Sequence, residues 1–167
     1  EGKDKLSDRV YTVRSLDLGA NTLEVDIYRH PGGPTCDWAE SLPIGETVGI
    51  MGPGGKGGPS VADPAQFLLA GGDETAVPVM LRAIETLPHS VNGCVFMLVD
   101  DPTDTQPIGP TSLNVRWLLR SEGKTETDLV EAIIRAESQS ASTSLWFAAS
   151  QEAARQIREH GRHVLNL

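Results

Sequence analysis

The stretch from Phe67 to Pro88 constrains the fold of this chain more than any other. It reads FLLAGGDETAVPVMLRAIETLP, in which a short apolar run meets two glycines and apolar residues then recur at helical spacing. These features predict a strand, a tight turn and a helix. Pro78 fits only the first turn of a helix, where a missing N–H costs little. We therefore predict Thr75 as the N-cap, with Asp73 and Glu74 just before it.

A turn of this kind directs free backbone N–H groups and the positive end of a helix dipole into a loop. Such a loop suits an anion, for example a dinucleotide phosphate. The structural alternative is that Gly71 and Gly72 only let the chain reverse, because strand, glycine turn and helix occur throughout α/β proteins. The pattern by itself leaves both interpretations open.

Strands and helices are predicted to alternate through the rest of the C-terminal part. The patterns predict strands at residues 93–99, 113–119 and 144–149 and helices at residues 125–136 and 150–160. Thr125 or Thr127 caps the first of these helices, Ser150 caps the second, and Gly161 stops it. Alternation of this kind implies a parallel sheet with helices on both faces.

The ligand crevice of a parallel sheet lies beyond the carboxyl ends of its strands, so the loops after these strands should share one edge. Asp100 and Asp101 stand there, where a carboxylate can accept hydrogen bonds from ribose hydroxyls. A solvated turn is the alternative, because Asp-Asp-Pro-Thr-Asp is also good turn chemistry. Arg120, at the end of the next strand, faces either a phosphate or solvent.

The N-terminal part has the pattern of antiparallel strands. Residues 9–16 and 22–29 alternate in polarity around a turn that contains Gly19, which predicts an antiparallel pair with one buried face. A loop with a helical turn near residues 36–42 follows, and residues 46–51 predict a third strand. So few strands form part of a barrel or sandwich more readily than a complete one.

Composition excludes several classes of protein. The 167 residues suffice for one domain, or one domain with part of another, and their 39% hydrophobic content is that of a soluble globular protein. Apolar runs fall well short of the ~20 residues of a membrane span, so we expect a cytoplasmic protein without stable membrane insertion. The net charge of −9 argues against a nucleic-acid partner. Cys36 and Cys94 are too few for a zinc site, and we predict no metal site.

Several short strings occur in a recognisable order. Residues 9–14 read RVYTVR, His30 precedes GPTCDWA at residues 33–39, GPGG follows at 52–55, and residues 69–78 read LAGGDETAVP. This ordered set resembles the R-x-Y-T-x-R, H-G-x-G-P-A-S-x-W-A, G-P-G-G and L-A-G-D-E-T-A-L-P segments of the siderophore-interacting protein family. Members of that family are flavin-dependent ferric-siderophore reductases of the ferredoxin-reductase-like group. The last string carries one extra glycine.

The resemblance implies a parallel nucleotide-binding α/β sheet, preceded by part of an antiparallel flavin-binding β-barrel. Residues 1–58 would form the C-terminal part of the FAD-binding barrel, and residues 59–167 an NAD(P)H-binding domain. NAD(P)H would reduce FAD, and the flavin would reduce the iron of a ferric siderophore or another ferric chelate. No nucleophile or general acid is needed, so we predict no catalytic side chain. The alternatives are a general flavin reductase of the same fold and a non-catalytic nucleotide-binding module.

The same resemblance implies the cofactor-binding residues. Arg9 would hold the FAD pyrophosphate, while Tyr11 and Thr12 would contact the isoalloxazine. His30 is either a flavin-loop residue that can donate a proton or part of a plain turn. The full predicted set is Arg9, Tyr11, Thr12, His30, Gly33, Pro34, Thr35, Trp38, Gly72, Asp73, Glu74, Thr75, Ala149 and Ser150.

Two departures from the family pattern affect these expectations. The earlier strands of the flavin barrel do not precede residues 9–14, so we expect a fragment of a longer polypeptide, a partner chain that supplies the strands, or a different mode of flavin binding. The W-x-A-G-E loop of the family reads WFAAS at residues 146–150, which removes a carboxylate from the expected nicotinamide site. Asp100 and Asp101 favour NADH whereas Arg120 favours NADPH, so the preference stays open.

Overall fold

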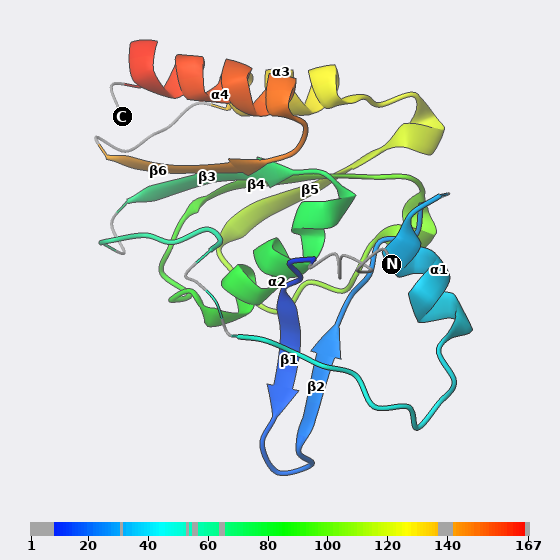
Figure 1. Cartoon of the computed structure of the whole chain (residues 1–167). Coiled ribbons are helices and arrows are strands. Elements are labelled where there is room, and N and C mark those ends of the chain that lie inside the picture. Colours follow the sequence, from blue (N-terminus) through cyan, green and yellow to red (C-terminus); the bar gives the residue numbers. More distant parts are fainter. Residues whose placement is uncertain are drawn as a thin grey trace. The chain divides into compact units, whose positions relative to one another are not determined.

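The computed structural model describes residues 9–30, 32–52, 54, 57–63, 66–136 and 142–165. The chain divides into two compact units, Glu1–Lys56 and Gly57–Leu167. The first contains a two-stranded sheet and the second a four-stranded sheet (Figure 1). The glycine-rich string at residues 52–55 lies partly outside the described residues. Within the described ranges, no helix combines the length and the apolar character that a membrane crossing requires.

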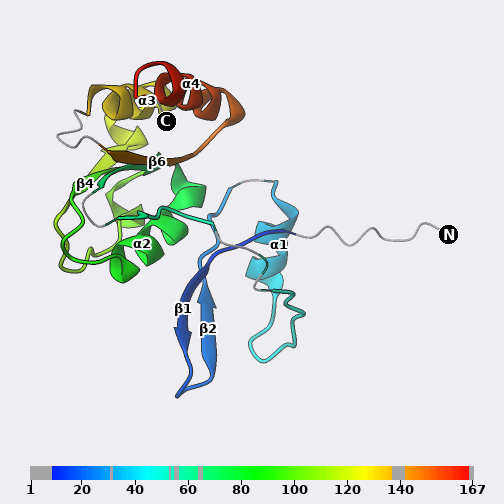
Figure 2. The same cartoon turned by 90° about the vertical axis from the view of Figure 1, so that its left-hand side faces the viewer.

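The first unit is built on an antiparallel hairpin of β1 (Val13–Asp17) and β2 (Thr22–Val25), as the sequence predicts (Figure 2). The carboxylate of Asp17 accepts hydrogen bonds from the backbone N–H groups of Gly19, at 2.8 Å, and Ala20, at 3.0 Å. These bonds lower the pKa of Asp17. Turn chemistry of this kind closes the hairpin locally.

Helix α1 (Pro34–Ser41) follows the hairpin and begins with proline in its first turn. It matches the helical turn predicted near residues 36–42. Cys36 lies in this helix and is buried, and its thiol donates to the backbone oxygen of Tyr28 at 3.3 Å. The helix is thereby tied to the chain segment that leaves β2.

Three predictions for this unit are wrong. Residues 9–12 and 26–29 lie outside the ladder, and residues 46–51 form no strand. No face of the hairpin is buried either, because Leu16 and Leu23 are 53% and 40% exposed. A strand exists only beside a hydrogen-bonding partner, and a two-stranded hairpin has too little surface to bury a face of its own. The described residues of this unit supply no further strand.

The second unit is a parallel sheet with the strand order β5-β4-β3-β6. Its strands are β3 (Phe67–Gly72), β4 (Gly93–Val99), β5 (Leu113–Leu119) and β6 (Thr143–Ala148). Helix α2 (Val77–Thr86) covers one face, and α3 (Glu126–Arg135) and α4 (Gln151–His163) cover the other (Figure 1). The predicted fold class is confirmed: a parallel sheet with helices on both faces, and a small antiparallel sheet at the N-terminus.

Two apolar cores flank this sheet because successive side chains of a strand point to opposite faces. Along β3, Leu68 and Ala70 pack toward α2 with Met80 and Met97, and Leu69 packs toward α3 and α4. The uninterrupted apolar sequence of β4 supplies both cores, as expected of a strand buried on both faces. This packing fixes the positions from which the loops at the strand ends project.

The prediction that Gly71 and Gly72 form a turn is wrong, because both belong to β3. A Cβ atom at Gly72 would lie 2.6 Å from the backbone oxygen of Ala148 and would overlap Ala76. At Gly71 a Cβ atom would lie 2.9 Å from the side chain of Ile133. The glycines are therefore required by close packing and not by a left-handed backbone.

The helix ends test the predicted caps. Thr125 caps α3 and Ser150 caps α4, as predicted. Thr75 is not a cap, because Asp73 instead caps a short 3₁₀ helix, η1 (Glu74–Ala76), that leads directly into α2. The predicted end of α4 is also wrong: the helix continues through Gly161, where a Cβ atom would lie 2.9 Å from the end of the Leu145 side chain.

Candidate functional site

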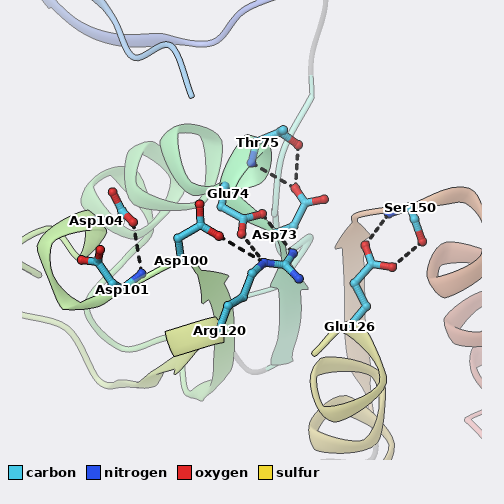
Figure 3. Close-up of polar contacts among 9 residues, drawn as sticks. All are labelled: Asp73, Glu74, Thr75, Asp100, Asp101, Asp104, Arg120, Glu126 and Ser150. Atoms are coloured by element: carbon cyan, nitrogen blue, oxygen red, sulfur yellow. Dashed lines mark hydrogen bonds and ion pairs between the residues drawn. The ribbon is translucent and has the colours of Figure 1, made fainter. Parts of the chain in front are cut away.

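Polar side chains from distant segments meet at the carboxyl edge of the four-stranded sheet (Figure 3). Asp73, Glu74 and Thr75 follow β3, Asp100 follows β4, and Arg120 follows β5. Parallel strands end at the same edge, so neighbouring strands place these groups side by side. The structure thus brings together the loops that the sequence assigned to one edge.

Arg120 is held by two carboxylates. Its Nε lies 2.5 Å from Oε1 of Glu74 and 3.6 Å from Oδ1 of Asp100, and its Nη2 lies 3.2 Å from Oε2 of Glu74 (Figure 3). The side chain of Glu74 is 7% exposed, that of Arg120 35% and that of Asp100 50%. The hydrogen bond to Glu74 and the charges of both carboxylates raise the pKa of Arg120.

This pairing corrects the sequence interpretation of Arg120, which expected either a phosphate or solvent. The guanidinium faces carboxylates of its own chain. Glu74 is the one charged residue in the buried class among the residues described, and a buried carboxylate needs a cation beside it. Arg120 therefore serves first to compensate Glu74.

The start of η1 is closed to an anion. Oδ1 of Asp73 accepts from the backbone N–H of Thr75 at 3.0 Å and from its hydroxyl at 2.6 Å. A carboxylate of the chain thus occupies the positive end of the helix dipole and would repel a phosphate. The dinucleotide-phosphate interpretation of this turn does not fit, and the alternative of a glycine turn fails as well, because Gly71 and Gly72 belong to β3.

Asp101 also has a structural role. Its Oδ1 accepts from the backbone N–H of Thr103 at 2.7 Å and from the Thr103 hydroxyl at 2.6 Å, and Asp104 accepts from the Asp101 N–H at 3.1 Å. The Thr103 hydrogen bonds lower the pKa of Asp101. Of the two aspartates, Asp101 thus follows the turn interpretation, and only Asp100 faces Arg120.

A carboxylate that sequence reasoning missed lies beside Ser150. Oε1 of Glu126 accepts from the backbone N–H of Ser150 at 3.2 Å, and Oε2 accepts from its hydroxyl at 2.6 Å. The Ser150 oxygen in turn accepts from the N–H of Ala153 and caps α4. Glu126, in the first turn of α3, thus places a carboxylate beside the 146–150 loop. The acidic first turn was visible in sequence, but its direction toward Ser150 was not.

The predicted residues before β1 lie in an extended segment. Arg9 and Tyr11 are exposed and Thr12 is half-buried. Residues 9–12 lie outside the ladder. Their contacts with a flavin therefore stay a prediction.

The other predicted residues of the first unit gather at the start of α1. The His30 ring lies over the backbone of Gly33, where a Cβ atom would lie 2.5 Å from the ring. Gly33 precedes Pro34 and Thr35, and no side-chain hydrogen bond caps this helix. Trp38 is 45% exposed and so is not a core residue. Unlike the start of η1, this helix start has no side-chain cap, and Asp37 is the acidic residue of its first turn.

Metal coordination has no support in the part of the chain that the structure describes. No group of three or more His, Cys, Asp or Glu side chains there could hold a metal ion. Burial raises the pKa of the Cys94 thiol, which opposes thiolate chemistry at that residue.

The architecture is that of α/β proteins that bind ligands at the carboxyl edge of a parallel sheet. Residues 64–167 match the model of the siderophore-interacting protein family, and residues 1–57 match that of the siderophore-interacting FAD-binding domain. The chain belongs to the siderophore-interacting protein family. This confirms the resemblance carried by its short sequence strings.

Relatives and solved structures agree with this membership. The ferric vibriobactin reductase ViuB of Vibrio cholerae is 34% identical over 127 residues, which cover 75% of this chain and 46% of that protein. The ferric acinetobactin reductase of Acinetobacter baumannii is 27% identical over 90 residues, 53% of this chain and 31% of that protein. The siderophore-interacting protein SipS of Aeromonas hydrophila has a TM-score of 0.77 at 26% identity, covering 92% of this chain and 60% of that one. The chain thus spans less than half of ViuB.

The siderophore-interacting protein of Acinetobacter baumannii superposes with a TM-score of 0.84 at 20% identity. The match covers 99% of this chain and 68% of that chain. This likeness shows the fold alone.

Proposed function

We propose that this chain takes part in the reduction of ferric siderophores in the cytoplasm, with FAD as the cofactor and NAD(P)H as the electron source. The observation that carries the proposal is the matching of the two units, in order, to the FAD-binding and siderophore-interacting models of one family. Residues 1–58 would belong to the FAD-binding barrel and residues 59–167 to the NAD(P)H-binding domain. The ferric reductases among the relatives support the choice of substrate.

The start of α1 fits the FAD pyrophosphate. No side-chain hydrogen bond caps its backbone N–H groups, and Asp37 is the one acidic residue of its first turn. Arg9 supplies a guanidinium, which can grip phosphate oxygens by two hydrogen bonds. Tyr11 and Trp38 are exposed aromatic side chains on which the isoalloxazine or adenine can pack.

FAD, when bound, supplies transfer of electrons from NAD(P)H to iron: one NAD(P)H gives two electrons, which reduce two Fe(III) to Fe(II) and leave NAD(P)⁺ and a proton. The residues of this chain would bind, orient and shield the reactants. Reduction of Fe(III) needs only electrons, so it requires no proton transfer from a side chain of the predicted set. His30 remains a candidate proton donor beside the flavin loop.

The carboxyl edge of the sheet would form one wall of the NAD(P)H site. Asp73 and Thr75 lock each other, Glu74 is fixed by Arg120, and Ser150 is fixed by Glu126. Side chains held by such contacts lose little freedom when a ligand arrives, which favours binding. Ala149 brings no large side chain to this wall, whereas Gly72 is buried against Ala76 and Ala148.

The first unit would be completed by further β-strands, from a longer polypeptide or from a partner chain. Its exposed apolar side chains are numerous for a unit of this size: Val10, Tyr11, Val13, Leu16, Leu18, Leu23, Trp38, Ile44, Val48, Ile50 and Met51. Apolar surface of this extent marks an interaction surface in soluble proteins. Added strands would also give residues 46–51 a ladder partner.

The test compares two arginine variants of the same unit. Arg9→Ala should lower the FAD content of the purified protein, whereas Arg29→Ala, which removes an exposed ion pair with Glu40, should leave it unchanged. FAD is measured by absorbance and by fluorescence after denaturation. Unchanged FAD in Arg9→Ala would contradict the pyrophosphate role of Arg9, and absence of FAD from the wild-type protein would contradict the proposed cofactor.

Substrate choice needs a separate assay with the wild-type protein. The proposal predicts faster reduction of ferric siderophores than of simple ferric chelates, each compared with reduction by free flavin. Equal turnover with every acceptor would instead identify a general flavin reductase of the same fold.

A further inference from the structure

We propose that the carboxyl edge of the four-stranded sheet selects NADH over NADPH, with Asp100 and Arg120 as the residues that determine this choice. The inference rests on the proposed function, because it takes this edge as the nicotinamide-nucleotide site. The two cofactors differ by a phosphate on the adenosine ribose, so the question is whether this edge offers that phosphate a cation.

The four loops that follow the strands contain only two cations, and all of these loops lie within the described residues. Lys124 Nζ lies 3.8 Å from Oδ1 of Asp128. Arg120 lies between Glu74 and Asp100. Each cation thus faces a carboxylate of the chain. Further carboxylates in the same loops are Asp73, Asp101, Asp104 and Glu122.

Arg120 cannot turn toward a phosphate without leaving Glu74. The Glu74 side chain is 7% exposed, and its two oxygens receive Nε and Nη2 of Arg120. Separating them would leave a buried carboxylate without its cation, which strongly destabilises the folded state. Even in place, the guanidinium is outnumbered by two carboxylates. A ribose phosphate approaching it would therefore meet net negative charge.

A ribose with free hydroxyls suits the same group. Asp100 is half-exposed, and an ionised carboxylate offers about four acceptor positions, so it can face Arg120 and still accept from a hydroxyl. Asp101 is less suited, because its Oδ1 already accepts from the N–H and the hydroxyl of Thr103. Asp100 is thus the carboxylate placed to recognise the unphosphorylated ribose.

The test measures binding of two nucleotide fragments, ADP and 2′,5′-ADP, to the full chain by calorimetry. We expect ADP to bind at least about tenfold more tightly, since like charges at a binding site discriminate strongly. Asp100→Asn removes one carboxylate from Arg120 and should reduce this ratio severalfold. Glu122→Gln removes a charge from the same edge, but the Glu122 carboxylate forms no ion pair with Arg120 in the described structure. This variant should keep the ratio within about twofold.

The outcomes separate this inference from the proposed function. Equal or tighter binding of 2′,5′-ADP overturns the NADH preference and leaves ferric reduction intact. An equal shift in Asp100→Asn and Glu122→Gln overturns the role of Asp100. Binding of neither fragment overturns the inference together with the nicotinamide step, while reduction of ferric siderophore by photoreduced FAD on the protein would show that the remainder of the proposed function stands.

Discussion

The guanidinium of Arg120, at the end of β5, binds the carboxylate of Glu74, at the end of β3, through Nε and Nη2. Strand β4 lies between β3 and β5 in the sheet, so this pair bridges the edge across a central strand. Asp100, at the end of that strand, faces the same guanidinium. One arginine therefore ties together the ends of three strands.

Loss of this arginine should destabilise the sheet edge. Arg120→Ala leaves Glu74 buried without a cation, and we expect the free energy of unfolding to fall by about 2 kcal/mol, below the full cost of breaking a buried pair because Arg120 is partly exposed to solvent. Urea unfolding measures the change. The control is Arg116→Ala, an exposed arginine of β5, which should change stability by less than about 0.5 kcal/mol.

The same pair can be examined by a double-mutant cycle. Glu74→Gln in the Arg120→Ala background should restore part of the lost stability, because the buried charge is gone. An Arg120→Ala variant as stable as the wild type would contradict the compensating role of this residue.

Close packing at the end of β3 should make Gly72 intolerant of a side chain. Gly72→Ala places a methyl group against the backbone oxygen of Ala148, which cannot rotate away, and we expect a loss of about 3 kcal/mol in unfolding free energy. Gly71→Ala should cost less, because its main obstacle is the flexible end of Ile133. Gly109→Ala, with nothing within 4 Å, is the control. Thermal unfolding measures the three variants, and equal melting temperatures of Gly72→Ala and Gly109→Ala would contradict this order.

The cap of α3 predicts a defined pH dependence. Hydrogen bonds from Thr125 lower the pKa of Asp128 below its usual value of about 4. A lowered pKa in the folded state means that this contribution to stability is complete above about pH 4 and is lost as the pH falls through the folded value. Asp128→Asn should therefore lower the urea midpoint at pH 7 and approach the wild type near pH 3.

Thr125→Ala tests the same cap from the other side. It removes the donor hydroxyl and the cap, at a cost of about 1 kcal/mol at pH 7. The difference from the wild type should narrow in acid as Asp128 is protonated, without vanishing, because the bond from the Asp128 N–H to the Thr125 hydroxyl oxygen does not titrate. A constant difference from the wild type at all pH values, in both variants, would exclude Asp128 as the titrating group.

The contact between Glu126 and Ser150 should appear as a coupling energy. A cycle of Glu126→Ala and Ser150→Ala should give about 1 kcal/mol in unfolding free energy. It isolates the bond from the Ser150 hydroxyl to the charged but exposed carboxylate, because the backbone N–H of residue 150 remains in Ser150→Ala. Glu131 lies on the same helix and pairs with Arg135, so Glu131→Ala with Ser150→Ala should show almost no coupling. Equal coupling in the two cycles would mean that α3 acts on α4 without this specific contact.

Much of the second unit could be predicted because its patterns are local. The apolar run of β4, the 3.6-residue spacing of α2 and α3, and the caps Thr125 and Ser150 are each encoded within a few neighbouring residues. Predictions failed where a distant contact overrides local preference. Gly71 and Gly72 would suit a turn, and Gly161 a helix end, but each is small because another segment packs against it.

The sequence by itself determined the class of fold, the membership of the family and the order of the loops at the carboxyl edge, because these follow from periodicity and from short strings. The site within the stretch from Phe67 to Pro88 was decided by the tertiary structure. Strand order places Arg120 over Glu74, and helix packing turns Glu126 toward Ser150. Which charged groups pair depends on what lies beside them in space, and no local pattern contains that information.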